Sequence, residues 1–156
     1  MNEMEVINIF FGGMNLVKYI FASHGTLAKG ILSSIELIIG KQSNIYTICG
    51  YIDENFDLSA EIDNYFSKIS RDDIVIVITD ILGGSINNEF LSQLKCREFH
   101  LIAGLNLSLV LELIVSLNEG INLELQINNA IEKSKVNIKY CNQFLNKEIK
   151  DVTTSF

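Results

Sequence analysis

Apolar residues along this chain gather in short runs, and each run is followed by apolar positions at helical spacing. Four runs predict β-strands, at 16–22, 44–49, 74–79 and 98–103. The segments after them predict helices, at 27–38, 58–69, 87–95 and 107–117. The third run, Ile74–Thr79, is nearly all β-branched, which is typical of a central strand buried on both faces. Four βα units in series predict an α/β fold with a doubly wound, mainly parallel four-stranded sheet and helices on both faces.

The two ends of the chain depart from this pattern. Residues 123–131 carry one more helical stripe, and Val136–Tyr140 alternate apolar and polar residues, which predicts a short C-terminal edge strand. Gly12 and Gly13 precede Met14, so we expect 1–13 to be a leader or tag-like extension. The expected domain division is then a single domain over 14–150 with a tail at 151–156.

Composition narrows the classes of partner. A length of 156 residues with 48% hydrophobic residues fits one domain with a substantial core. The net charge of -7 disfavours binding to nucleic acid or anionic lipid, so neutral or basic partners fit better.

No apolar run reaches the roughly 18 residues of a membrane span, and the acidic start lacks the positive region of a signal peptide. We therefore expect a cytoplasmic protein without direct membrane insertion.

The cysteines and histidines give little support to a metal site. Cys49, Cys96 and Cys141 are far apart and odd in number, which disfavours a disulfide framework and a zinc site. We expect them to be buried, reduced thiols. With two histidines in the chain and no cluster of ligands, we expect no metal.

Reactive side chains follow two of the predicted strands. His24 follows the first strand, and Asp80 follows the third. In a flavodoxin-like strand order these strands are neighbours, so both side chains flank the crevice at the switch point of the sheet. A carboxylate that accepts a hydrogen bond from one imidazole nitrogen leaves the other nitrogen unprotonated and nucleophilic. The sequence therefore predicts His24 as a nucleophile and Asp80 as the residue that orients it.

The loop after the third strand suits an anion. Gly83 and Gly84 are free to adopt positive φ, Ser85 adds a hydroxyl, and the backbone N–H groups open a helix. A phosphoryl group is the expected ligand. Singly, a loop histidine can be structural, a Gly-Gly pair can be only a turn, and an aspartate before a helix is commonly an N-cap. Their convergence on one sheet edge favours the functional interpretation.

A nucleotide P-loop is excluded. Gly25 and Gly30 have the spacing of its glycines, but Ile31 and Leu32 stand where lysine and serine or threonine would bind phosphates and magnesium.

Three motifs together resemble one protein family. They are Ser23-His24-Gly25 with Leu27, Ala28 and Gly30; Asp80 to Ser85 with Asn87; and Ala103-Gly104-Leu105-Asn106-Leu107. In this order and at these intervals they resemble the IIA component of the mannose-type (mannose/fructose/sorbose) sugar phosphotransferase system. The resemblance runs from about Met14 to the tail helix. Ile86 and Ser108 depart from it, because family members usually carry proline there.

The resemblance implies a phosphoryl carrier. His24 would accept a phosphoryl group from the phosphohistidine of HPr and donate it to a histidine of the IIB component, which works with the membrane components IIC and IID. Asp80 matches the acidic partner of the histidine, and Gly25, Gly83, Gly84 and Ser85 match the phosphoryl-binding residues. No cofactor is implied. The family fold is a homodimer that exchanges a C-terminal strand, for which Val136–Tyr140 is the candidate.

Docking of such partners leads us to expect an exposed apolar rim around His24, formed by Leu27, Leu82 and Ile86. Two alternatives remain open. One is the phosphotransferase subunit of a dihydroxyacetone kinase, whose histidine motif usually has serine where Gly25 stands here. The other is a flavodoxin-like regulatory module without phosphoryl chemistry, in which His24 and Asp80 only pack or cap.

Overall fold

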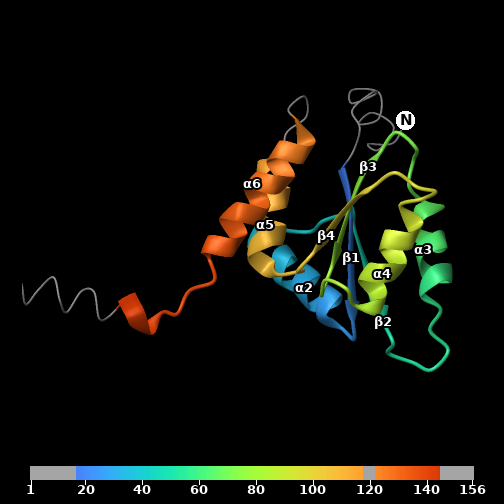
Figure 1. The fold of residues 1–156 in the computed structure, drawn as a ribbon, viewed down its shortest axis with the longest axis horizontal. Helices are drawn as coiled ribbons and strands as arrows, with labels where there is room; N and C mark the ends of the chain where they lie inside the picture. The colour runs from blue at the N-terminus through green and yellow to red at the C-terminus, as the bar shows by residue number, and fades with distance from the viewer. Residues whose placement is uncertain (1–16, 118–121, 145–156) are drawn as a thin grey trace, which may run out of the picture. The chain divides into compact units, whose positions relative to one another are not determined.

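The computed structural model describes residues 17–117 and 122–144, in four strands and five helices. In chain order these are β1 (Val17–His24), α2 (Leu27–Ile39), β2 (Ile45–Gly50), α3 (Leu58–Phe66), β3 (Ile74–Thr79), α4 (Ser85–Gln93), β4 (His100–Ala103), α5 (Leu107–Ser116) and α6 (Leu123–Val136) (Figure 1). The chain forms two compact units that divide after Leu107, with the whole sheet in the first. The predicted extension 1–13 and tail 151–156 lie outside the described residues, and the single domain over 14–150 stays a prediction.

The sheet has the strand order β2-β1-β3-β4, and all three pairings are parallel. Tyr19 of β1 is in register with Ile45 of β2 and with Ile76 of β3. The chain adds β2 on one side of β1 and then returns to add β3 and β4 on the other, so the switch point lies between β1 and β3. The predicted doubly wound α/β fold is confirmed, and the carboxyl ends of β1 and β3 lie side by side.

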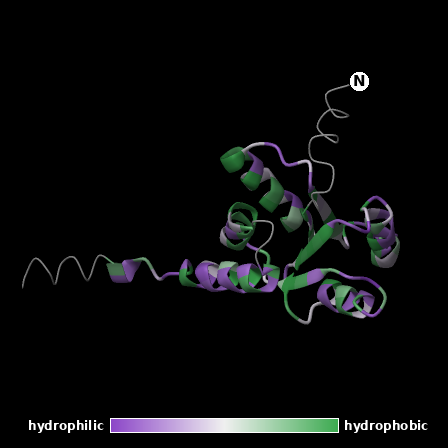
Figure 2. Ribbon diagram, turned by 90° about the horizontal axis from the view of Figure 1, so that it is seen from above, coloured by the Kyte–Doolittle hydropathy of each residue, from purple (hydrophilic) through white to green (hydrophobic). Residues whose placement is uncertain are grey.

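Helices cover both faces of this sheet. On one face Ile20 and Val77 of the strands pack with Ile62 of α3 and Phe90 of α4. α2 packs on β1 and β2 from the other face, and Figure 1 shows the sheet between α2 and the pair α3 and α4. The central strands are drawn in the hydrophobic colour in Figure 2, as expected for strands buried on both faces. Each large apolar side chain buried in this way stabilises the fold by about 1.5–3 kcal/mol.

The second unit holds most of α5 and all of α6. Asn122 caps α6, because its side chain accepts a hydrogen bond from the N–H of Leu125. Lys133 of α6 forms an ion pair of 3.4 Å with Glu112 of α5. α6 alternates hydrophilic and hydrophobic residues along its length in Figure 2, which is typical of an amphipathic helix.

The predicted C-terminal strand is absent from the described chain. Val136 is the last residue of α6, and residues 137–140 join no sheet. Ile138 and Tyr140 are exposed. A strand requires a neighbouring strand for its backbone hydrogen bonds, and a period-two pattern alone does not show that the chain provides one.

The expectation of three buried thiols is also wrong. Cys49 is half-buried in β2, whereas Cys96 and Cys141 are exposed. Both exposed cysteines follow the end of a helix, where the chain has left the packed core. Across 17–117 and 122–144, no helix combines the length and the apolar character needed to cross a bilayer.

Candidate functional site

His24 and Asp80 meet at the carboxyl edge of the sheet. His24 is the last residue of β1, and Asp80 directly follows β3. The N–H of Asp80 donates to the carbonyl of Ala22 at 3.1 Å, which extends the β1–β3 pairing and holds the aspartate beside the histidine. Oδ2 of Asp80 then accepts two hydrogen bonds from His24, one from the backbone N–H and one from Nδ1, each at 2.8 Å.

This contact sets the chemistry of the imidazole ring. With Nδ1–H donating to the carboxylate, Nε2 keeps the lone pair and is the nucleophilic nitrogen. Nε2 lies 3.1 Å from Oγ of Ser85, the first residue of α4. The His24 side chain is 44% exposed and that of Asp80 is 13% exposed. The ring is therefore accessible to another molecule, while the carboxylate that orients it is largely covered.

Asp80 is held in its ionised form. Its burial acts to raise the pKa, but the hydrogen bonds from the backbone and the ring of His24 and from the N–H of Ile81 outweigh it. The pKa of Asp80 is lowered from the ordinary value of 3.8 as a result. The carboxylate is therefore negatively charged at neutral pH.

The two glycines of the loop after β3 serve different needs. Gly83 adopts a φ of +77°, which favours glycine, as predicted. Gly84 does not: its φ is −67°. A Cβ on Gly84 would lie 2.7 Å from Cγ2 of Ile81 and 3.4 Å from Cε1 of His24. Gly84 is therefore required by the close packing of Ile81 within the loop rather than by its own conformation.

Several donors of the site are already engaged by the protein. The N–H of Gly25 donates to the carbonyl of Gly50, and the N–H of Gly84 donates to the carbonyl of Ile81. The N–H of Gly83 donates to Oδ1 of Asn87. The first N–H groups of α4 lack acceptors within the helix, and Gly84 at its N-cap provides no side chain to cap them. This helix start and the Ser85 hydroxyl are the donors that can meet an anion bound at Nε2 of His24.

Asn87 fixes the loop, a role that sequence analysis did not assign. Its side chain is buried, and its Nδ2 donates to Oγ1 of Thr79 at 2.9 Å while its Oδ1 accepts from the N–H of Gly83 at 3.1 Å. The loop after β4 is fixed to the same strand end, because the N–H groups of Gly104 and Leu105 both donate to the carbonyl of Thr79. The sequence showed Asn87 only as part of a motif, because its burial, which requires hydrogen-bond partners for the side chain, is visible only in the structure.

Tyr51 is a second residue that sequence analysis missed. Its ring stacks on the imidazole of His24, with 5.4 Å between ring centroids and 22° between planes. Tyr51 directly follows β2, and β2 pairs with β1, so its position at the same sheet edge was available from the strand order.

Of the three residues predicted to form an exposed apolar rim, two are exposed. These are Leu27 and Leu82, and Ile81, between Asp80 and Leu82, is exposed as well. Ile86 is fully buried in the cluster between the sheet and the helices α3 and α4. It was predicted as exposed because a docking partner would contact the rim around His24, but the i, i+4 spacing places it with Phe90 on the face that packs on the sheet.

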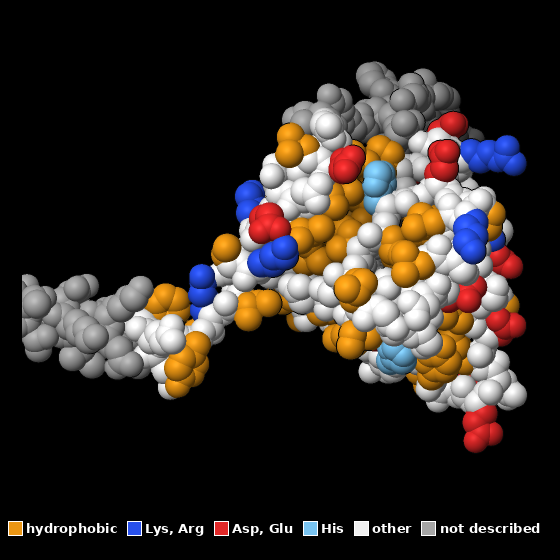
Figure 3. Space-filling view, viewed as in Figure 1, with side chains coloured by type: hydrophobic (Ala, Val, Ile, Leu, Met, Phe, Trp, Pro, Cys, Tyr) orange, Lys and Arg blue, Asp and Glu red, His pale blue; other side chains and the backbone are white. Residues whose placement is uncertain are grey.

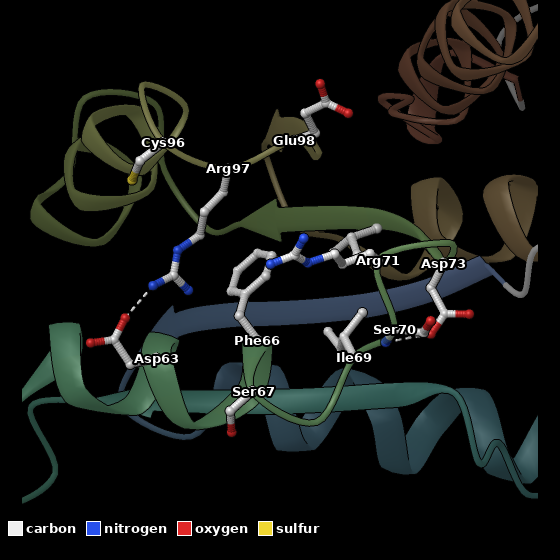
Figure 4. A pocket seen from close by; sticks show the side chains of 11 residues that line it. Asp63, Phe66, Ser67, Ile69, Ser70, Arg71, Asp73, Cys96, Arg97 and Glu98 are labelled. Atoms are coloured by element: carbon white, nitrogen blue, oxygen red, sulfur yellow. Dashed lines mark hydrogen bonds and ion pairs between the residues drawn. The ribbon is translucent and has the colours of Figure 1, made fainter.

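A hollow lies at the amino edge of the sheet, opposite the edge that carries His24 and Asp80 (Figure 4). It has a volume of about 660 Å³ and is lined by both arginines of the chain, Arg71 and Arg97. Arg97 pairs with Asp63 and lies over the ring of Phe66, 4.8 Å from its centroid. The described residues contain no group of His, Cys, Asp and Glu that could hold a metal ion.

The two histidines lie at opposite edges, because His24 ends β1 and His100 begins the parallel strand β4. Figure 3 shows two separate histidine patches on the surface. His24 and Asp80 therefore lie at the carboxyl edge, away from the hollow beside Arg71 and Arg97.

Known proteins resemble the chain in sequence and fold. Residues 18–134 match the family model of the PTS system fructose IIA component. A protein from Klebsiella pneumoniae assigned as a phosphoenolpyruvate-dependent sugar phosphotransferase system permease is 45% identical, with a TM-score of 0.77 over 84% of this chain and 95% of that one. Phosphotransferase system component EIIA from Streptococcus agalactiae is 26% identical, with a TM-score of 0.69 over 82% of this chain and 99% of that one.

The mannose/sorbose-specific IIA subunit of the phosphotransferase system from Enterococcus faecalis shares the fold at 22% identity. Its TM-score is 0.65, over 81% of this chain and 94% of that one. The matched range 18–134 begins inside β1 and ends inside α6, so it includes His24, Asp80 and the loop between β3 and α4.

Proposed function

Because the chain belongs to the fructose IIA family of the sugar phosphotransferase system, we propose that it is a phosphoryl carrier with His24 as the phosphorylated residue. It accepts the group from HPr and passes it to a IIB component, which works with the membrane components IIC and IID. We place this exchange in the cytoplasm. The observation that carries the proposal is the histidine held through Nδ1 by Asp80, with Nε2 turned to Ser85 at the start of α4.

The geometry supports a simple transfer step. The lone pair of Nε2 forms a bond to phosphorus while the bond from phosphorus to the donor nitrogen breaks, and that electron pair returns to the donor. The proton on Nδ1 stays in its hydrogen bond to Asp80, whose negative charge offsets the positive charge of the phosphorylated ring. The Ser85 hydroxyl and the first N–H groups of α4 are placed to meet the phosphoryl oxygens. Catalysis by positioning and fixed charge needs no cofactor.

The surroundings of the site suit a basic protein partner. A hollow of about 560 Å³ borders Tyr51 and Ser85 and is also lined by Glu54, Asp57 and Glu89. These acidic groups would attract a partner's Lys or Arg side chains, and the net charge of -7 acts in the same direction. The exposed Leu27 and Leu82 would exclude water once the partner is bound.

Reconstitution tests this function. Phosphoenolpyruvate, enzyme I, HPr and the full chain are combined, and phosphohistidine is measured. We expect one phosphoryl group per chain, none in His24→Ala, and onward transfer when a IIB component is added. Repeating the assay at rising salt should slow transfer from HPr, because screening weakens the attraction between exposed charges.

His100→Ala is the matched control, because it removes the other histidine, at the opposite sheet edge, and should leave labelling intact. Transfer to a kinase-bound nucleotide instead of IIB would favour the dihydroxyacetone kinase alternative. If the wild-type chain took no phosphoryl label, that result would favour a regulatory module and refute the proposal of a phosphoryl carrier.

We also propose that the carrier is a homodimer in which residues 136–140 of one copy lie against the sheet of the other. Ile138 and Tyr140 are exposed, and β4 pairs with β3 alone among the described strands, which leaves one of its edges open. Sedimentation equilibrium should give twice the 17.5 kDa of one chain. A mass of 17.5 kDa at micromolar concentration would rule out the dimer.

A further inference from the structure

The imidazole of His24 is held at its edges by hydrogen bonds and on one face by an aromatic ring. Asp80 binds Nδ1, and Ser85 lies at Nε2. Hydrogen bonds at these two atoms leave the ring free to rock about the line that joins them. The ring of Tyr51, stacked at 5.4 Å and 22°, restricts that motion. We propose that Tyr51 is a positioning residue for phosphoryl transfer, an inference that rests on the proposed function of His24.

The backbone of Tyr51 supports this role. Its φ is +60°, and no other non-glycine residue in 17–117 or 122–144 has a positive φ. Residues other than glycine rarely adopt this backbone conformation, and adopting it costs them free energy. Glycine would avoid that cost. A tyrosine in this place indicates that the contact of its ring with His24 compensates for the strain.

Tyr51 is supported from behind by the core. Phe56 contacts it edge to face, with 5.7 Å between ring centroids and 61° between planes. Phe56 itself packs against the cluster between the sheet and the helices α3 and α4. The tyrosine ring is therefore placed between a packed side chain and the imidazole, which lets it hold the imidazole plane although its own side chain is half-exposed.

Tyr51 acts without taking part in any bond change. In the transfer step phosphorus leaves the donor nitrogen and bonds to Nε2, and Tyr51 gains and loses no proton. Its ring keeps Nε2 aimed at the start of α4 and faces the positive charge that the phosphorylated imidazole gains, as an aromatic face does for a cation. The positioned ring should accept a phosphoryl group from any donor, including one that docks on no protein surface.

A small donor separates positioning from partner docking. Phosphoramidate phosphorylates histidine as its own P–N bond breaks and ammonia leaves with a proton. With the full-length chain, Tyr51→Ala should slow labelling of His24 by phosphoramidate about two- to tenfold. Tyr51→Phe keeps the ring and should restore the wild-type rate. In the unphosphorylated protein, NMR should show ring-current shifts of the His24 ring protons in wild type and Tyr51→Phe but not in Tyr51→Ala.

Ile52→Ala is the matched control, because Ile52 is the neighbouring side chain and is 54% exposed against 53% for Tyr51. It should leave both the rate and the shifts unchanged. Wild-type rates and shifts in Tyr51→Ala would overturn the inference, and so would a Tyr51→Phe variant as slow as Tyr51→Ala. A wild-type chain that takes no label from phosphoramidate or HPr would instead overturn the proposed function, while the His24 ring shifts would still decide on the stacking contact.

Discussion

Asp80→Asn should lower the rate of phosphoryl transfer to His24 by about a hundred- to ten-thousandfold while the chain remains folded. The carboxylate accepts hydrogen bonds from the backbone N–H and Nδ1 of His24. An amide has one oxygen in place of two. With its NH2 group toward Nδ1 it favours the tautomer with the proton on Nε2 and removes the nucleophilic lone pair, and with its oxygen there the NH2 group opposes the N–H of Ile81. It also removes the negative charge that offsets the phosphorylated ring. The initial rate of labelling by HPr measures the effect.

Asp73→Asn is the matched control for this change. Asp73 also accepts a backbone hydrogen bond, from Ser70, but it lies at the amino edge of the sheet. Its variant should transfer at the wild-type rate. A loss of less than tenfold in Asp80→Asn, with the tautomer of His24 unchanged by NMR, would show that Asp80 does not orient the ring.

The difference in stability between wild type and Asp80→Asn should depend on pH in a defined direction. Because the folded-state pKa of Asp80 lies below its ordinary value of 3.8, the ionised carboxylate stabilises the fold above that value. This contribution is lost as pH falls through the lowered pKa. The free energies of unfolding of wild type and variant should therefore differ at pH 7 and converge in acid below pH 3.8.

Ile86→Asp should unfold most of the chain. Ile86 is 0% exposed and packs between the sheet and the helices, so the variant would bury a carboxylate without a partner and lose the apolar contact. The expected loss is about 4 kcal/mol or more, a large fraction of the total stability of a domain. Urea denaturation followed by circular dichroism measures it.

Ile38→Asp makes the same change at a side chain of α2 that is 56% exposed, and its effect should stay within about 0.5 kcal/mol. If Ile86→Asp were as stable as Ile38→Asp, Ile86 would have to face solvent, as the sequence first suggested. Its burial also means that an effect of Ile86→Asp on transfer would report folding rather than partner docking.

The elements whose signals are local could be predicted. The apolar run of β3 begins at Ile74 and ends at Thr79, and the strand has these bounds. The contact of His24 with Asp80 followed from topology, because the ends of adjacent parallel strands meet at one edge. The family resemblance is confirmed by the match over 18–134, whereas the roles of the site residues stay predictions.

The features that depend on packing could not be predicted in the same way. Whether Ile86 faces the core depends on how α4 packs on the sheet, and Tyr51 reaches His24 across a contact between two different strand ends. The need for glycine at position 84 also depends on packing, since it comes from the nearness of Ile81 rather than from the φ of Gly84. The alternating pattern of Val136–Tyr140 predicted a strand, but a single chain offers that segment no neighbour among its described residues.

The position of the phosphoryl group on the ring tests the roles proposed for His24 and Asp80 most directly. The chain is prepared with ¹⁵N-labelled histidine, phosphorylated through HPr, and analysed by NMR that correlates phosphorus with the ring nitrogens. We predict a single phosphoryl group on Nε2 of His24, with Nδ1 still protonated and bonded to Asp80. Phosphorus on Nδ1, or on any residue other than His24, would contradict the account.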